Sequence, residues 1–309
     1  MKIKDFQTFI NERDSQLRKV IMCVSTELGD FEFVIGDDFH ASQYMELFTK
    51  GDNPKKASLP VINFCNTHTK RLLEAGTPKE LIYNPEEKKM EIASKVKWHK
   101  THNDSKHVPK TILNADEIDQ LKFPIIAKPE NRFSGQGIIK IDSLEDSKDV
   151  DLSDFEVFSE KIDIDEEHRI MMWRGEPVMW VQRVHGNEET KEMTKKKDDK
   201  LYFKYVLKKM EDMPQNWQSV FNEFAETHSE LDIYSVDLMV DTDGKPWVVE
   251  MSSEFMPIYG VAAYYYKKVF EDFYGKKLNK EEDSQIDMLQ QKDVEATINF
   301  DKKRFSVEK

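Results

Sequence analysis

The sequence predicts an α/β fold with α+β portions, on two observations. Over residues 1–91, short apolar runs of strand length alternate with stretches whose apolar residues recur at helical spacing. Farther along, Asp243-Gly244 stands between two runs of alternating apolar residues, which is a strong hairpin signal. Strands connected by helices in one part and by tight turns in another indicate more than one lobe.

Residues 1–91 are expected to form a separate α/β lobe. Apolar side chains at helical spacing over residues 3–17 predict an amphipathic first helix. Residues 66–75 predict a second helix, and Gly76, Pro78 and Pro85 punctuate the way out of the lobe. Strands are predicted for the apolar runs at 19–24, 31–35 and 59–64.

The composition limits the class of function. The chain has 309 residues, a formal net charge of -13 and 39% hydrophobic residues, enough to bury a core. No basic surplus is present, so we expect no general nucleic-acid binding. Cys23 and Cys65 are too few for a zinc cluster or a disulfide scaffold. Because no apolar leader or uncharged membrane-length window is found, we expect a soluble cytoplasmic protein with no membrane partner.

The stretch 123–141 combines a lysine with a glycine-containing loop. Lys128 ends an apolar run, and Pro129 stops regular pairing after it. The residues that follow have backbones that bend freely and offer N–H groups to an anion. They are Asn131, Ser134, Gly135, Gln136 and Gly137. Since residues 138–141 resume a strand, this order suits closure over a polyphosphate. An ordinary hairpin with a long turn is the alternative, which the glycines alone favour.

Two neighbouring segments add candidates to this unit. Residues 92–98 look helical, and Lys95 or Lys97 can reach a phosphate from the side opposite Lys128, although each alone is typical of a solvated helix residue. The apolar run 155–162 predicts a strand that ends in Glu160 and Ile162. Such an edge suits adenine, because an apolar side chain packs on the base while backbone groups bond its edge.

Arg169 and Arg183 flank a turn that contains Gly175, Glu176 and Pro177. If the turn is symmetric about Glu176, the two arginines lie opposite each other on one face of a hairpin. Like charges in that position repel, so they need carboxylates or phosphates between them. We favour an anion-facing role. The alternative is a set of salt bridges to Asp163, Asp165 or Glu166.

Asp237 and Glu250 are the second decisive pair. Counting outward from the turn with Thr242 opposite Lys245 places Asp237 directly opposite Glu250 on one face of the hairpin. Two unpaired carboxylates at that separation need a shared proton, a basic neighbour or a divalent cation. A Mg²⁺ site fits, since Mg²⁺ takes one or two carboxylates plus substrate phosphates. The alternative is a salt-bridged sheet face.

In this order the motifs resemble those of the ATP-grasp superfamily, and most of all its carboxylate–amine ligases. The resemblance covers residues 92–256. It is carried by Lys95 before Pro109-Lys110-Thr111, Ala127-Lys128-Pro129 with Ser134-Gly135-Gln136-Gly137, Glu160-Lys161-Ile162, Glu167-His168-Arg169, and Asp237 with Glu250-Met251-Ser252. It implies an ATP-grasp fold in which two α+β subdomains, 92–160 and 161–275, clasp ATP. A Rossmann-like lobe, 1–91, would precede them, and a polar helical tail, 276–309, would follow.

The resemblance also implies roles for single residues. Lys95 and Lys128 would contact the phosphates of ATP, and the loop with Ser134, Gly135, Gln136 and Gly137 would close over them. Glu160 and Ile162 would line the adenine, Glu167 would bind the ribose, and Arg183, with Arg169 beside it, would face the γ-phosphate or an acyl-phosphate. Asp237 and Glu250 would hold Mg²⁺. Ser252 departs from the pattern, because the family usually has asparagine there, which puts a second metal ion in doubt.

The function implied is an ATP- and Mg²⁺-dependent, ADP-forming ligase. A carboxylate would be activated as an acyl-phosphate and joined to an amine, with positioning and charge neutralisation supplying most of the catalysis. Small-molecule or peptide substrates are expected, and a homo-oligomer is possible. Two alternatives stay open at this point: a phosphotransferase of the same fold that acts on a hydroxyl, and a nucleotide-binding regulator without turnover.

Overall fold

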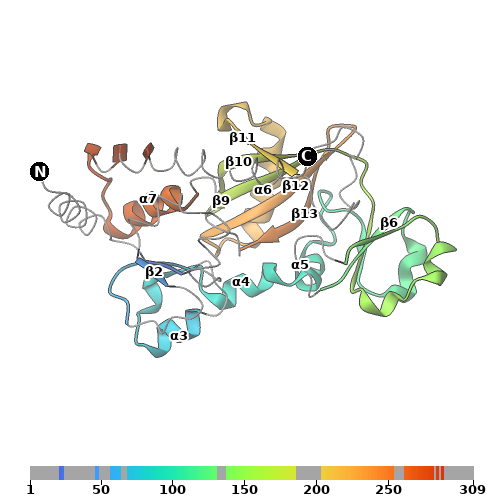
Figure 1. Cartoon of the computed structure of the whole chain (residues 1–309), viewed down its shortest axis with the longest axis horizontal. Helices are drawn as coiled ribbons and strands as arrows, with labels where there is room; N and C mark the ends of the chain where they lie inside the picture. Colours follow the sequence, from blue (N-terminus) through green and yellow to red (C-terminus); the bar gives the residue numbers. More distant parts are fainter. Residues whose placement is uncertain are drawn as a thin grey trace, which may run out of the picture. The chain divides into compact units, whose positions relative to one another are not determined.

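The structure is a computed structural model (Figure 1) that describes residues 21–23, 46–48, 56–63, 68–130, 137–185, 203–253, 261–281, 283–284 and 287–288. The chain forms two compact units. The first unit comprises Met1–Lys89, Glu230–Ile233 and Ser253–Lys309, and the second comprises Met90–Ser229 and Tyr234–Ser252. The predicted first helix, the predicted strand 31–35 and most of the predicted tail lie outside the described residues.

The first unit contains a four-stranded sheet in the order β2-β1-β3-β4, with every printed pairing parallel. The strands are β1 (Ile21–Cys23), β2 (Glu46–Phe48), β3 (Val61–Asn63) and β4 (Ile82–Tyr83). The helices are α3 (His68–Glu74), η3 (Lys79–Leu81) and α7 (Val261–Tyr274). The strands predicted at 19–24 and 59–64 and the helix at 66–75 are therefore confirmed. A Rossmann-like topology for this lobe stays a prediction.

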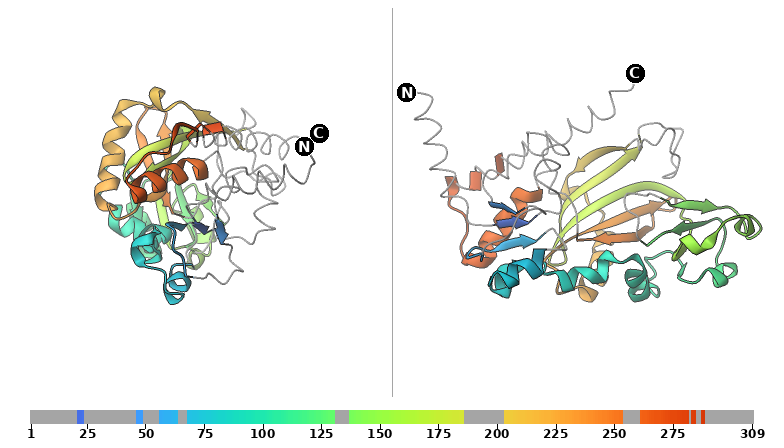
Figure 2. Two further views of the ribbon diagram at one scale, coloured as in Figure 1. Left: turned by 90° about the vertical axis from the view of Figure 1, so that its left-hand side faces the viewer. Right: turned by 60° about the horizontal axis from the view of Figure 1, so that its bottom comes forward.

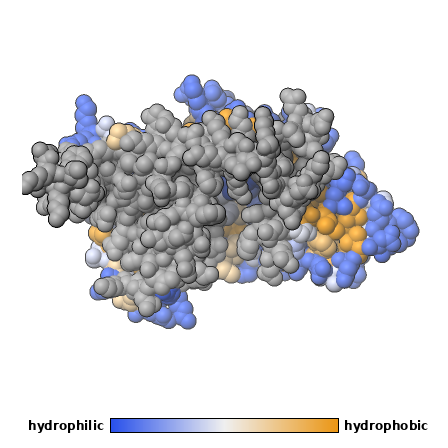
Figure 3. All heavy atoms as spheres, viewed as in Figure 1, coloured by the Kyte–Doolittle hydropathy of each residue, from blue (hydrophilic) through white to orange (hydrophobic). Residues whose placement is uncertain are grey.

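The second unit contains a four-stranded sheet that carries Lys128. Its order is β5-β8-β6-β7, and all its pairings are antiparallel. The strands are β5 (Thr111–Ile112), β6 (Ile125–Lys128), β7 (Ile139–Ile141) and β8 (Val157–Glu160), and the short helices are η4 (Ala115–Gln120), η5 (Asp146–Asp149) and η6 (Leu152–Asp154). Ile125, Ala127 and Phe158 belong to its buried core. Apolar side chains also gather on the visible face over this sheet (Figure 3).

A five-stranded sheet, in the order β11-β10-β9-β12-β13, forms the rest of the second unit. Its strands are β9 (Ile164–Trp173), β10 (Glu176–His185), β11 (Phe203–Lys208), β12 (Ile233–Asp241) and β13 (Pro246–Ser252). The long strands β9 and β10 run side by side (Figure 2). The helix α6 (Gln215–Thr227), preceded by η7 (Met210–Asp212), buries Trp217, Val220, Phe221 and Phe224, as its helical spacing predicts. Trp217 meets Trp180 of β10 at a ring separation of 5.4 Å.

The helix predicted over residues 92–98 is confirmed except at Ser94, where the chain divides into two helices. They are α4 (Glu86–Ala93) and α5 (Lys95–His102). Ser94, between them, adopts an extended conformation and accepts a hydrogen bond from the backbone N–H of Lys97, which makes it the N-cap of α5. Lys95 thus begins a helix. Among the described residues, no helix is long and apolar enough to cross a membrane.

Candidate functional site

The site is built on the hairpin of β12 and β13, where Asp237 pairs directly with Glu250. This predicted pair is confirmed, but the register from which it was counted is wrong near the turn. Pro246 faces Val240 and not Asp241, because the side chain of Asp241 accepts the backbone N–H groups of Asp243 and Lys245 and widens the turn. A β-bulge after Asp237 then shifts the register back by one residue.

Asp237 is held by two arginines from neighbouring strands. Arg169 donates Nε–H to Oδ1 at 2.6 Å and Nη2–H to Oδ2 at 2.7 Å, a bidentate pair. Nη2 of Arg183 lies 3.8 Å from Oδ2. Burial alone would raise the pKa of Asp237, but Arg169, Arg183 and Lys128 outweigh it, and the pKa is lowered. Asp237 therefore carries a full negative charge at neutral pH.

The predicted register of the two arginines is wrong. Arg169 faces Val181, and Arg183 faces Glu167, so the arginines are diagonal neighbours on one face of the sheet. The turn is centred on Arg174 and Gly175, whose φ angles of 46° and 87° belong to the left-handed region, and not on Glu176. The expected carboxylates between the arginines are present, but they are Asp237 and Glu167.

Glu167 is buried at 3% exposure and forms an ion pair with Arg183 through its Oε1. Its other oxygen, Oε2, has no hydrogen-bond partner in the part of the chain that the structure describes. Burial raises the pKa of Glu167, although the charge of Arg183 opposes the shift. The resemblance gives Glu167 the ribose hydroxyls, and a free carboxylate oxygen is the acceptor that such a role requires; the role itself stays a prediction.

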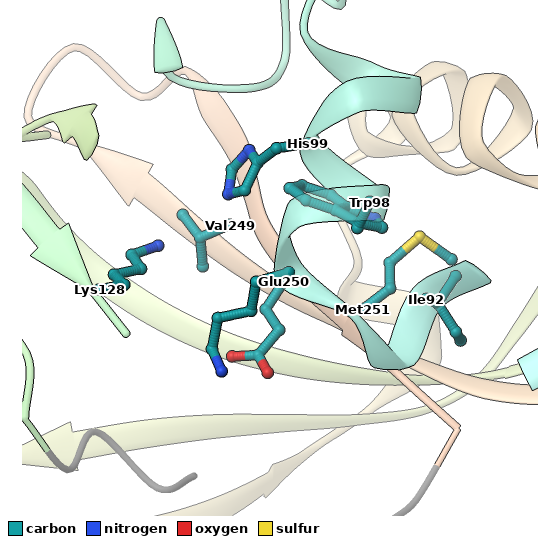
Figure 4. A pocket seen from close by; sticks show the side chains of 8 residues that line it. Ile92, Trp98, His99, Lys128, Val249, Glu250 and Met251 are labelled. Atoms are coloured by element: carbon teal, nitrogen blue, oxygen red, sulfur yellow. The ribbon is translucent and has the colours of Figure 1, made fainter. Parts of the chain in front are cut away.

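A small pocket in the second unit is lined by residues from both of its sheets, with Lys128 from β6 and Glu250 from β13 (Figure 4). It is lined by Ile92, Lys95, Trp98, His99, Lys128, Val249, Glu250 and Met251. Three candidates from the sequence thus come together: Lys95, Lys128 and Glu250. The sequence reasoning missed Trp98 and His99, which stand three and four residues after Lys95. That spacing places Trp98 and His99 on the same face of α5 as Lys95, so the sequence could have predicted that they accompany this lysine.

Charges in this pocket influence one another. Burial lowers the pKa of Lys128, and Lys95 lowers it further, while Glu250 and Asp237 oppose the shift. Burial raises the pKa of Glu250, and so does Asp237, while Lys128 and Lys95 lower it. The surrounding strands remove part of the water around the Glu250 carboxylate, although part of the residue stays exposed to solvent. That carboxylate accepts no hydrogen bond from any residue that the structure describes. A cation bound beside such an unpaired carboxylate stabilises its ionised form.

Lys95 is tied to the start of the predicted phosphate loop by Glu130. Its Nζ donates to the backbone carbonyl of Glu130 at 2.9 Å, and the Glu130 carboxylate accepts the hydroxyl of Ser94 and the N–H of Val96. Glu130 thus caps the α5 N-terminus, where a negative charge is stabilising. Gly137 has a φ of 72°. The loop residues Ser134, Gly135 and Gln136 lie outside the described residues.

Three further candidates do not line the pocket. Glu160 accepts the backbone N–H of Lys122 through Oε1 at 2.9 Å, and Ile162 is half-buried beyond the end of β8. Ser252 pairs with Ser235, whose hydroxyl donates to the Ser252 carbonyl at 3.3 Å. Because Ser252 stands two residues after Glu250 on the same strand, it shares the face of that carboxylate. The roles assigned to these residues stay predictions.

No protein-family model matches the chain, and no curated protein matches its sequence. Solved structures do. The D-alanine–D-alanine ligase from Bacillus anthracis, in complex with ATP, aligns over 93% of this chain and 99% of its own with a TM-score of 0.55 and 17% identity. The ATP-grasp ligase PsnB, in complex with a variant of its minimal precursor, Mg and ADP, aligns over 89% and 98% with a TM-score of 0.54 and 12% identity. The chain has the ATP-grasp fold.

A third structure with the ATP-grasp fold, the L-amino acid ligase from Bacillus licheniformis, aligns over 81% of this chain and 70% of its own with a TM-score of 0.51 and 13% identity. The fold predicted from the motifs is therefore confirmed. At such low identities the likeness concerns the fold. What this chain binds must be argued from its own side chains.

The side chains on this ATP-grasp fold suit Mg²⁺ bound together with a nucleotide. Among the described residues, no group of three or more His, Cys, Asp or Glu side chains could hold a metal ion. Asp237 and Glu250 supply two hard carboxylate ligands, and Mg²⁺ commonly completes such a set with phosphate oxygens and water. The Glu250 carboxylate has no bond to a described residue and can bind the metal ion directly, whereas the Asp237 carboxylate already binds Arg169.

Proposed function

We propose that this chain is an ATP- and Mg²⁺-dependent ligase that joins a carboxylate to an amine and releases ADP. The observation that carries the proposal is the convergence of opposite charges on one side of the five-stranded sheet. Asp237 and Glu250 stand opposite each other, Arg169 and Arg183 lie beside Asp237, and Lys128 is close enough to shift its pKa. Cations and metal-binding carboxylates together suit the transfer of a phosphoryl group.

Each group has a distinct task in the proposal. Lys95 and Lys128 neutralise the phosphates of ATP, and Asp237 and Glu250 hold Mg²⁺. When bound, Mg²⁺ would withdraw negative charge from the phosphate oxygens. Arg183, with its Nη2 at 3.8 Å from Asp237, orients the anion that reacts. Arginine suits this task because its planar guanidinium binds a carboxylate or a phosphate through two parallel hydrogen bonds.

The reaction proceeds in two steps. A carboxylate oxygen of the substrate attacks the γ-phosphorus of ATP, the bond from that phosphorus to the bridging oxygen breaks, and ADP leaves with the electron pair. The amine nitrogen of the second substrate then attacks the carbonyl carbon of the acyl-phosphate. The carbon–oxygen bond breaks, inorganic phosphate leaves, and the nitrogen loses a proton. No side chain becomes covalently attached, so positioning and charge stabilisation carry the catalysis.

Amino acids or peptides are the proposed substrates. In the structures with which the chain aligns, one protein is named a ligase of D-alanine, one a ligase of L-amino acids, and PsnB is bound to a precursor peptide. The two arginines favour a substrate that presents a carboxylate. The formal net charge of -13 mildly favours cationic or neutral partners over polyanions.

The test measures two products with the same protein. Purified protein with Mg²⁺ and ATP is incubated with pools of amino acids and short peptides, and ADP release is followed. Hydroxylamine is then added in place of the amine, because it converts an acyl-phosphate into a stable hydroxamate. A ligase gives ADP and hydroxamate with the same pool.

Variants make this assay specific. Glu250→Gln should abolish ADP release, because the amide cannot serve as an anionic metal ligand. Glu166→Gln is the matched control, because Glu166 is a carboxylate on another strand of the same sheet, β9, and its side chain bonds His168 and Gln182. If ADP release is accompanied by a substrate phosphorylated on a hydroxyl, and no hydroxamate forms, the protein is a phosphotransferase and not a ligase. If the protein binds the nucleotide but releases no ADP with any substrate pool, it is a nucleotide-binding regulator without turnover.

A further inference from the structure

His99 is a buried imidazole beside the lysines of the pocket. It lies on α5, its residue is 3% exposed, and it lines the pocket with Lys95, Lys128 and Glu250. Figure 4 shows the ring of His99 and the side chain of Lys128 turned toward each other. No role follows for this histidine from the motifs in the sequence, yet it belongs to the surface that a nucleotide in this pocket would meet.

The ring of His99 has an unsatisfied polar atom. Its Nδ1 is buried and has no hydrogen-bond partner in the part of the chain that the structure describes. A neutral imidazole carries one N–H donor and one lone pair, and either is costly to bury without a partner. Buried polar groups are nearly always paired, so an unpaired one beside a pocket points to a partner that a ligand brings.

The neighbours of His99 select the kind of ligand atom. Lys128 and Lys95 offer positive charge, and the structure gives the Lys128 ammonium no hydrogen bond to a described residue. Burial, with the charges of Lys128 and His102, lowers the pKa of His99 to about 2, so the ring is neutral and supplies a donor without adding charge. A phosphoryl oxygen accepts from an ammonium and from an imidazole N–H at once, and it is the acceptor that a nucleotide would bring here.

We propose that Nδ1–H of His99 donates a hydrogen bond to a phosphoryl oxygen of the bound nucleotide, on the phosphate that Lys128 neutralises. His99 thereby fixes the phosphate in position relative to Lys128 and Glu250. The inference rests on the proposed function, because it requires a nucleotide in this pocket.

Another histidine on the same helix provides a matched control. His102 is also buried, but its Nε2 lies 2.8 Å from Nε2 of His228, so its ring is paired inside the protein. It does not line the pocket. Replacing His102 tests what the loss of a buried imidazole from α5 does to nucleotide binding in general.

The experiment measures the binding of ADP with Mg²⁺, and of adenosine, by calorimetry. The full-length wild type is compared with His99→Phe, His99→Asn, His99→Gln and His102→Phe. An asparagine amide N–H lies near the position of Nδ1–H, whereas a glutamine amide reaches the position of Nε2. We expect His99→Phe and His99→Gln to weaken ADP binding by about tenfold or more. His99→Asn should stay within about threefold of the wild type, because it keeps the donor.

Two further readouts separate this role from a structural one. Adenosine should bind all variants equally, since it has no phosphate. The melting temperature of unliganded His99→Phe should be no lower than that of the wild type, because an apolar ring replaces an unpaired polar one. Unchanged ADP affinity in His99→Phe and His99→Gln would overturn the inference, and so would an equal loss for adenosine. If the wild type binds no ADP, the proposed function itself fails.

Discussion

Arg169 binds both carboxylate oxygens of Asp237, with Nε at 2.6 Å from Oδ1 and Nη2 at 2.7 Å from Oδ2. The guanidinium therefore occupies the oxygens that a metal ion at the Asp237–Glu250 pair would share. The carboxylate of Glu250, on the strand opposite, has no hydrogen bond or ion pair with any residue that the structure describes. A cation that enters this site must compete with Arg169 for the Asp237 carboxylate, but it can bind the Glu250 carboxylate without displacing a described residue.

Removing Arg169 should strengthen metal binding in the absence of nucleotide. In Arg169→Gln the oxygens of Asp237 lose their bidentate partner, and the site loses a positive charge that repels a divalent cation. We expect affinity for Mn²⁺, titrated by electron paramagnetic resonance, to rise by about tenfold or more. Arg174→Gln, at the turn between β9 and β10, removes the same charge away from Asp237 and should leave the affinity as it is. Weaker Mn²⁺ binding in Arg169→Gln would show that the arginine supports the metal site.

The two carboxylates should differ in what they contribute to stability. Asp237→Asn leaves Arg169 and Arg183 without their shared counterion, so unfolding free energy should fall by about 3 kcal/mol or more. Glu250→Gln should be neutral or stabilising, because the raised pKa of Glu250 means that its ionised form is disfavoured in the folded protein. Urea denaturation at pH 7 measures both. A larger loss from Glu250→Gln than from Asp237→Asn would contradict this ranking.

The pairing of Asp237 with Glu250 was predictable because a turn signal and an alternating pattern fix which residues share a face. The count succeeded only because two departures cancel. Asp241 widens the turn by binding two backbone N–H groups, and the bulge after Asp237 restores the register. Neither departure has a sequence signal as strong as Asp243-Gly244, since both depend on how the backbone settles locally.

The register of the arginines could not be predicted in the same way. It depends on Arg174 adopting a φ of 46°, which is uncommon for residues other than glycine, and on a second bulge between Pro177 and Met179. The pocket could not be predicted from the sequence either, because it forms between α5, β6 and β13, which are distant in sequence. Helical spacing shows that Trp98 and His99 share a face with Lys95, but only the fold shows that this face borders a pocket.

Glu130 should determine how well Lys95 is positioned. Its carboxylate accepts the Ser94 hydroxyl and the Val96 N–H, while its carbonyl holds the Lys95 ammonium at 2.9 Å. Glu130→Gln removes the negative charge at the α5 N-terminus and should lower ADP affinity by roughly threefold to tenfold through a less well fixed Lys95. Calorimetry checks the affinity.

A double-mutant cycle measures how strongly the contact between Ser94 and Glu130 stabilises the fold. Ser94→Ala and Glu130→Gln remove the two sides of one hydrogen bond, so their effects on unfolding free energy should be coupled by about 0.5–3 kcal/mol. Glu117→Gln is a suitable control, because Glu117 is exposed and its side chain, among the described residues, bonds Asn114 alone. Additive effects of Ser94→Ala and Glu130→Gln would show that the two side chains act independently.

The contact between His102 and His228 should make the protein sensitive to mild acid. Burial and then the charge of His228 lower the pKa of His102 from its ordinary 6.5 to about 4. A histidine with a depressed pKa is neutral in the folded protein but takes up a proton on unfolding between these two values. Its stabilising contribution is complete above pH 6.5 and is lost as the pH falls toward 4, by roughly 1.4 kcal/mol per pH unit.

His102→Phe isolates this contribution, because phenylalanine cannot titrate and still packs against Phe224, whose ring lies 4.7 Å from that of His102. We expect the unfolding free energy of the wild type, from urea denaturation at pH 7.5, 6 and 5, to fall more steeply with pH than that of His102→Phe. The variant should be the less stable of the two at pH 7.5, where the hydrogen bond to His228 is intact in the wild type. Since both proteins keep every other titrating group, parallel curves would show that the His102 ring gains its proton equally well in the folded and unfolded chains.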